Sequence, residues 1–164
     1  MGKIRTPAVA YLRTSSAINV GADKDSDKRQ RTAIAAFAKR AGFAFVGEFY
    51  DAAVSGADPI EGRPGFAALL DQVEANGVRV VIVEDASRFA RELMIQEAGI
   101  AVLALRSVRL LTAAGDDLTV SDDPGRVLMR QMVGAFAQYE KARLVAKLRS
   151  GRERKARESG KCGP

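Results

Sequence analysis

The chain has 164 residues, 47% of them hydrophobic, which is enough for one domain with a substantial apolar core. It contains no histidine and only one cysteine, Cys162, so Ser-His-Asp hydrolysis, histidine-ligated zinc and an intrachain disulfide are excluded. No apolar segment approaches the roughly 20 residues that span a bilayer, and the N-terminus lacks the apolar core of a signal peptide. We therefore expect a cytoplasmic protein with no membrane partner.

The alternation of apolar runs and helical segments predicts an α/β domain. Strands are expected at 8–12, 43–50, 78–83 and 108–112, and helices at 28–41, 64–76 and 92–105. Gly42 and Gly77 mark the ends of the first two helices, and Ile34, Phe37 and Ala38 are expected to face inward. Strands separated by helices imply right-handed crossovers, hence a mainly parallel sheet of about four to five strands with helices on both faces.

The last predicted element is a helix over residues 124–158, roughly 50 Å long at about 1.5 Å per residue. Its first half carries an apolar stripe at spacings of four and three, made by Leu128, Met132, Phe136 and Tyr139. The alternative is a core helix with a charged end. We divide the chain into a domain at 1–123, this helix, and the start of a linker at 159–164.

The net charge of +6 is concentrated at the C-terminal end. Residues 141–164 hold nine Lys or Arg against two Glu and carry +7, whereas residues 1–140 sum to −1. Basicity confined to one segment favours a polyanionic partner. A solvated, charged helix face is the simpler alternative.

Arg13 and Ser15 directly follow the first strand. Side chains alternate along an extended strand, so Tyr11, Arg13 and Ser15 share one face if the extended geometry persists. A permanently cationic fork beside a hydroxyl suits a phosphate ester. The alternative is an N-capping serine before a loop.

Two further arginine motifs follow predicted strands. Ser87-Arg88-Phe89-Ala90-Arg91 comes after the strand at 78–83, at the strand end where parallel sheets bind ligands. If Arg88 starts a helix, Arg91 lies beside it on the same face, although both arginines could instead pair with Asp85 or Glu92. A loop with Ser55 and Gly56 precedes Arg63, which stands at the start of a predicted helix, where free N–H groups attract anions. The alternative is a plain surface loop.

In this order and at these intervals, the motifs resemble those of the serine recombinases, the resolvases, invertases and large phage integrases. The run from Tyr11 to Ser16 resembles the nucleophile motif, and Lys28-Arg29-Gln30 resembles the segment that follows it. The second motif is similar to Asp51…Ser55-Gly56…Arg63-Pro64-Gly65-Phe66 and the third to residues 87–91. The run Gln138-Tyr139-Glu140-Lys141-Ala142-Arg143 resembles a stretch of the family's long helix.

The resemblance implies a resolvase-like fold and a site-specific DNA recombinase without cofactor or metal. Ser15 would attack a DNA phosphodiester, leaving a 5′-phosphoserine link, while Arg13, Arg63, Arg88 and Arg91 stabilise the charge. Supporting site residues would be Tyr11, Gln30, Ser55, Ser87 and Glu140. The partners would be double-stranded DNA and further copies of the chain, as a dimer on one site and a tetramer in synapsis.

The same resemblance assigns two roles to the long helix. The apolar stripe of Leu128, Met132, Phe136 and Tyr139 would form the oligomer interface. DNA would be bound by the basic residues Lys141, Arg143, Lys147, Arg149, Arg152, Arg154, Lys155 and Arg157. Members of the family continue into a DNA-recognition module, and residues 159–164 resemble the linker to one.

The chain departs from the family's pattern at two positions. Many members have an aspartate where Ser87 stands, so a carboxylate there is missing or supplied by Asp85, and Lys141 replaces a frequent arginine. The proton acceptor for Ser15 is left open between an acid such as Glu140 and water.

Two other functions were weighed against DNA recombination. One is a small-molecule phosphoester enzyme on a doubly wound fold, which is disfavoured because no glycine-rich phosphate loop follows the first strand. The other is a non-catalytic oligomerisation or regulatory domain.

Overall fold

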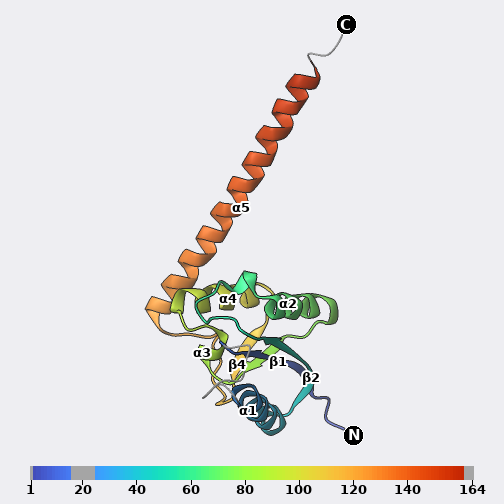
Figure 1. Ribbon diagram of the computed structural model, residues 1–164, viewed down its shortest axis with the longest axis vertical. Coiled ribbons are helices and arrows are strands. Elements are labelled where there is room, and N and C mark those ends of the chain that lie inside the picture. The colour runs from blue at the N-terminus through green and yellow to red at the C-terminus, as the bar shows by residue number, and fades with distance from the viewer. Residues whose placement is uncertain (1, 16–24, 161–164) are drawn as a thin grey trace.

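The computed structural model describes residues 2–15 and 25–160 (Figure 1). Its strands are β1 (Thr6–Arg13), β2 (Phe43–Asp51), β3 (Val80–Val83) and β4 (Arg109–Thr112). Its α-helices are α1 (Ser26–Ala41), α2 (Pro64–Asn76), α3 (Ala86–Phe89), α4 (Leu93–Leu105) and α5 (Pro124–Ser159), and a 3-10 turn spans Ile60–Gly62.

The four strands form one parallel sheet in the order β2-β1-β3-β4. The predicted parallel sheet is therefore confirmed. β1 is the longest inner strand and pairs with β2 from Thr6 to Arg13, with a register irregularity between Ala8 and Val9. The Val-rich β3 is fully buried beside it, as expected for a central parallel strand.

Helices cover both faces of the sheet, as predicted. α1 lies on one side, and α2 and α4 lie on the other (Figure 1). Ile34, Phe37 and Ala38 of α1 are buried against Ala8, Ala10 and Leu12, while α2 and α4 pack on the opposite face around Val9, Tyr11 and Val81. Alternate residues of β1 thus supply two separate apolar cores, which is the period-two pattern of a doubly covered strand.

Most element boundaries agree with the sequence pattern. Gly42 and Gly77 end α1 and α2 with φ of 80° and 67°, a left-handed conformation that glycine adopts without steric cost. The third strand is shorter than predicted. Pairing with β4 begins at Val80, and the side chain of the preceding Arg79 turns back to donate to the carbonyls of Val73 and Val78.

The expectation that Arg91 lies one helical turn beyond Arg88 is wrong. α3 ends at Phe89, and Ala90 is extended. In a continued helix the Arg91 N–H would donate to the Ser87 carbonyl. That carbonyl accepts from the Arg13 guanidinium instead, and the Arg91 N–H donates to the Gly56 carbonyl at 3.0 Å.

α5 has 36 residues, none of them buried, and it projects away from the sheet (Figure 1). It is therefore not a core helix. At about 1.5 Å per residue it is about 54 Å long. Leu128, Met132, Phe136 and Tyr139 are each 57–66% exposed, so the apolar stripe faces solvent in the single chain. Within the described ranges, no helix has both the length and the apolar character needed to cross a membrane.

Candidate active site

The candidate site lies where the sheet's connections diverge. β1 and β3 are neighbours, but α1 leads from β1 to one edge of the sheet, whereas α4 leads from β3 to the other. In open α/β sheets this divergence leaves a crevice at the carboxyl ends of the two strands, where ligands bind. Ser15 follows β1 at that edge, and Arg88 lies on α3 directly after β3.

Ser15 is exposed at the end of β1, and the residues before it are held firmly. The Thr14 N–H donates to the Asp51 carbonyl at 3.1 Å, and the Thr14 carbonyl accepts from Val54 at 3.0 Å. The buried Gln30 amide forms hydrogen bonds with both backbone polar groups of Arg13. It donates to the Arg13 carbonyl at 3.1 Å and accepts from the Arg13 N–H at 3.3 Å. These contacts fix the chain from which the Ser15 hydroxyl projects.

Arg13 is 1% exposed and donates from all three guanidinium nitrogens to backbone carbonyls. Nε binds the Arg88 carbonyl at 3.1 Å, Nη1 binds Val54 at 2.8 Å, and Nη2 binds Ser87 at 2.9 Å. Arg13 therefore joins the end of β1 to both neighbouring loops.

Arg63 is the second buried arginine, also 1% exposed. It donates from Nη1 to the Phe89 carbonyl and to the Tyr11 hydroxyl, and from Nη2 to the Asp58 carbonyl at 3.0 Å. Its Nε has no hydrogen-bond partner among the described residues. Together, Arg13 and Arg63 hold three consecutive carbonyls, those of Ser87, Arg88 and Phe89.

Asp51 completes this buried layer and was not among the predicted site residues. Its carboxylate accepts the N–H groups of Gly65 at 2.7 Å and Phe66 at 3.0 Å, at the start of α2, and the Tyr11 hydroxyl at 2.9 Å. A helix N-terminus favours such a carboxylate. Asp51 thus fixes the helix that Arg63 precedes.

Arg88 and Arg91 differ from the buried pair. The Arg88 side chain is 16% exposed and donates from Nε to Glu84 at 3.1 Å, so its partner is Glu84 rather than Asp85 or Glu92. Arg91 is exposed, and within the described residues its guanidinium makes no hydrogen bond or ion pair. Its stem packs against Gly56, where any Cβ would lie 2.5 Å from Arg91 Cγ.

The clustered cations shape the electrostatics of the site. Burial lowers the pKa of Arg13, and the positive charges of Arg63, Arg91 and Arg88 lower it further. Burial raises the pKa of Tyr11 far above its ordinary value, with the Arg63 hydrogen bond opposing the shift. Tyr11 therefore remains a neutral donor to Asp51, and the surplus of positive charge favours an anionic ligand.

The other predicted site residues lie further from this cluster or make local contacts. The exposed Ser55 hydroxyl accepts from the Ala57 N–H within its own turn. Ser87 donates its hydroxyl to Asp85, whose Oδ1 also accepts the backbone N–H groups of Ser87 and Arg88 and so caps α3. Glu140 is exposed on α5, and no contact in the described chain brings it to Ser15.

Two further functional candidates, Gln96 and Glu97, were missed. They are buried neighbours on α4, a helix that is otherwise almost wholly apolar. Gln96 donates to the carbonyls of Ala86 and Ala90, and Glu97 forms ion pairs with Arg126 and Arg130 of α5. Two adjacent polar residues in an apolar helix are the sequence signal that would have found them.

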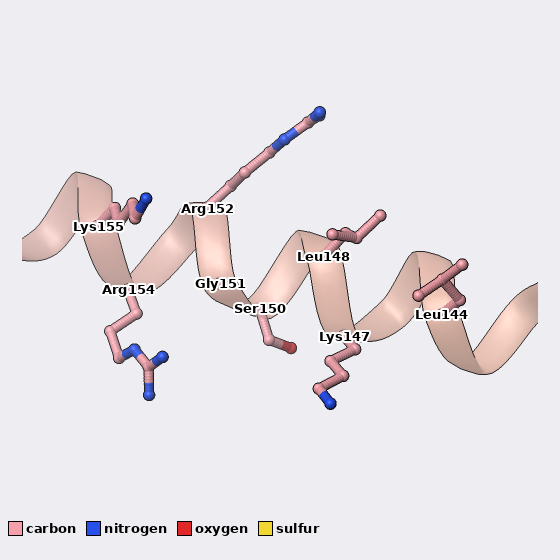
Figure 2. Close-up of a pocket in the computed structure, with 8 residues that line it drawn as sticks. All are labelled: Leu144, Lys147, Leu148, Ser150, Gly151, Arg152, Arg154 and Lys155. Atoms are coloured by element: carbon pink, nitrogen blue, oxygen red, sulfur yellow. The ribbon is translucent and has the colours of Figure 1, made fainter.

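The basic side chains of the distal half of α5 are exposed to solvent. Leu148 and Arg152 project to one side of the helix and Lys147 and Arg154 to the other, with Gly151 between them (Figure 2). The hollow at Gly151 is lined by residues of α5 alone, so no second element encloses it. This surface is suited to an extended ligand rather than to a small molecule.

A family model described as the resolvase N-terminal domain matches residues 8–161, and the chain belongs to this family. The Tn2501 transposon resolvase of Escherichia coli is 36% identical over 110 residues, which cover 66% of this chain and 54% of that protein. The chain therefore spans about half the length of this relative.

Two solved structures extend the similarity. A resolvase family site-specific recombinase from Streptococcus pneumoniae is 27% identical with a TM-score of 0.61, covering 93% of this chain and 99% of that one. The N-terminal catalytic domain of TP901-1 integrase has a TM-score of 0.62 at 18% identity, covering 84% and 98%, and shows a shared fold. The predicted family and the resolvase-like fold are thus confirmed.

Proposed function

We propose that the chain is the catalytic domain of a serine-type site-specific DNA recombinase, with Ser15 as the nucleophile. The observation that carries the proposal is the position of an exposed serine at the sheet's switch point, beside four clustered arginines. A cationic site of this kind suits a phosphodiester, and the family match supports DNA as its source.

In the proposed reaction the Ser15 hydroxyl oxygen attacks phosphorus in line with the 3′-oxygen. The new Oγ–P bond replaces the P–O3′ bond, and the serine proton is transferred overall to the departing 3′-hydroxyl. Because the 5′-phosphoserine link conserves the ester, a 3′-hydroxyl can reverse the step without ATP. Rejoining to a new partner gives integration, excision or inversion.

The four arginines would contribute in two ways. Arg88 and Arg91 have guanidinium N–H groups that no described residue occupies, so they are placed to donate directly to the non-bridging oxygens. Arg13 and Arg63 already donate to carbonyls. They add positive charge where they lie.

The proton of the Ser15 hydroxyl needs an acceptor when the oxygen attacks. Asp85 lies on the neighbouring turn, but its Oδ1 accepts three hydrogen bonds that cap α3. Arginine does not deprotonate in proteins, and Glu140 lies on the exposed surface of α5. We therefore favour water as the first acceptor in the single chain.

The proposed role of α5 is to join copies of the chain and to contact DNA. The exposed stripe of Leu128, Met132, Phe136 and Tyr139 is apolar enough to drive association, as a dimer on one site and a tetramer in synapsis. Beyond it, uncovered Lys and Arg side chains are suited to phosphate contacts along a DNA groove.

The test is capture of protein-linked DNA ends. Full-length protein and its Ser15→Ala variant are incubated with supercoiled DNA that flanks the gene, and the reaction is stopped with detergent. We expect covalent adducts on 5′ ends with Ser15, at least a thousandfold fewer with Ser15→Ala, and wild-type levels with Ser16→Ala as the matched control. Equal adducts from Ser15→Ala would refute the assignment.

A further inference from the structure

Every backbone carbonyl from Ala86 to Ala90 accepts a hydrogen bond from a side chain. Arg13 holds those of Ser87 and Arg88, and Arg63 holds that of Phe89. The two outer carbonyls, of Ala86 and Ala90, both accept from Gln96 of α4. The segment that carries Arg88 and leads to Arg91 is therefore fixed by three side chains from three different parts of the chain.

Gln96 holds both ends of this segment. Its Nε2 lies 3.0 Å from the Ala86 oxygen and 3.2 Å from the Ala90 oxygen, and the residue is 5% exposed. A primary amide has two N–H donors, and both are accounted for here. Because Ala90 is extended, its carbonyl has no helical partner, and Gln96 satisfies it.

The remaining polar atom of Gln96 faces α5. Its Oε1 lies 3.5 Å from Nη2 of Arg126, which is a long hydrogen bond. Glu97, the next residue, forms a close ion pair with Arg130, and Arg130 also donates to the carbonyls of Leu118 at 2.7 Å and Thr119 at 2.8 Å. The first turns of α5 are thus attached to the same two α4 residues.

Arg126 is shared between two incompletely satisfied acceptors. Its Nε lies 3.9 Å from Oε1 of the fully buried Glu97, an atom with no hydrogen-bond donor among the described residues. A small shift of α5 would change the lengths of both contacts. A buried polar atom without a partner costs free energy, so a movement of α5 that brings Arg126 closer to either acceptor lowers that cost.

We propose that Gln96 is a positioning residue that holds the arginine segment 86–91 in place and couples it to the seating of α5. The proposal rests on the proposed function, since it concerns the presentation of Arg88 and Arg91 to a phosphodiester. When α5 is seated, Arg126 orients the Gln96 amide, and the amide fixes both ends of the segment. When α5 moves, Gln96 loses this partner and the segment loosens.

Amide hydrogen exchange of the full chain without DNA is the first test. Gln96→Met removes the amide at similar size, and we expect the Ala90 and Arg91 amides to exchange about tenfold faster, while those of β3 are unchanged. Gln72→Met, which removes a glutamine from α2, is the matched control and should change the exchange of neither segment. Faster exchange throughout β3, or no change at residues 90 and 91, would overturn the positioning role.

A double-substitution series tests the coupling. Arg126→Met should speed exchange at Ala90 and Arg91 about threefold, and should add nothing in the Gln96→Met background, because both act through one amide. Independent, multiplicative effects would contradict the coupling. Single-turnover adduct formation should fall in Gln96→Met while DNA affinity stays within twofold. If wild-type protein forms no adduct, the proposed function fails, whereas the exchange data still decide the role of Gln96.

Discussion

The buried and the exposed arginine pairs of the site are built differently. Arg13 and Arg63 are each 1% exposed and donate to backbone carbonyls of two segments, the loop after β2 and the segment after β3. Arg88 is anchored only through Nε, and the Arg91 guanidinium is unpaired within the described chain. The difference indicates that the first pair constructs the site and the second pair is available to a ligand.

This contrast explains how four cations can lie close together. Burial lowers the pKa of Arg13, and the positive charges of Arg63, Arg91 and Arg88 lower it further, so the cluster opposes its own assembly. The carbonyl hydrogen bonds and the Glu84 carboxylate oppose that repulsion. The positive potential at the strand edge is thus present before any phosphate arrives, which is the preorganisation that catalysis of charged reactions requires.

The largest expected effect is a loss of reaction rate when an arginine of the exposed pair is removed. Arg91→Ala should lower the rate of adduct formation about a thousandfold, because in the proposed reaction Arg91 donates directly to the phosphate. Its free energy of unfolding should stay within about 0.5 kcal/mol of wild type, since the exposed guanidinium makes no hydrogen bond or ion pair within the described chain. Quench-flow kinetics and urea denaturation measure the two quantities.

The control for Arg91→Ala is Arg5→Ala. It removes an exposed arginine that precedes β1, at the opposite end of that strand from Ser15. It should leave both quantities unchanged. A loss of stability in Arg91→Ala comparable to its loss of rate would remove the distinction between the two pairs.

Substitution of a buried arginine should act mainly on the free energy of unfolding. Arg13→Met leaves three loop carbonyls without donors, and we expect the free energy of unfolding to fall by about 3 kcal/mol. Arg79→Met is the matched control: Arg79 also donates to two carbonyls but is exposed, so about 0.5 kcal/mol is expected. Equal losses in urea denaturation would show that burial does not distinguish these arginines.

A smaller effect follows from the protonation of Tyr11. Burial raises its pKa in the folded chain above the unfolded value of about 10, so the folded state keeps a proton that the unfolded state releases. Stability from this group is complete below pH 10 and falls above it, by about 1.4 kcal/mol per pH unit. Tyr11→Phe should flatten the decline between pH 10 and 11, whereas Tyr139→Phe, on an exposed ring, should leave it unchanged.

The agreement between sequence and structure depends on whether a signal is local. Three features were predicted correctly: the helix ends at Gly42 and Gly77, the inward face of α1, and the Val-rich β3. Each of them depends on residues that lie close together in the sequence. The position of Arg13 and Ser15 at the ligand-binding edge of the sheet was likewise predictable from the sequence, because parallel strands place their carboxyl ends at one edge.

The end of α3 and the role of Asp51 were not predictable in the same way. Arg13 and the Ser87 carbonyl that it captures are 74 residues apart, and Tyr11 and Asp51 are 40 apart. No local pattern shows that a backbone carbonyl will be taken by a distant side chain. The local rule of one helical turn between Arg88 and Arg91 therefore failed where long-range contacts replace helical ones.

The most direct test of the central claim is to locate the covalent bond in the protein. Adducts formed by the full-length protein on DNA are digested with nuclease and trypsin, and the nucleotide remnant is mapped by tandem mass spectrometry. The account predicts a phosphodiester-linked nucleotide on Ser15, within the tryptic peptide 14–24. A remnant on any other residue, or adduct yields that survive Ser15→Ala, would contradict it.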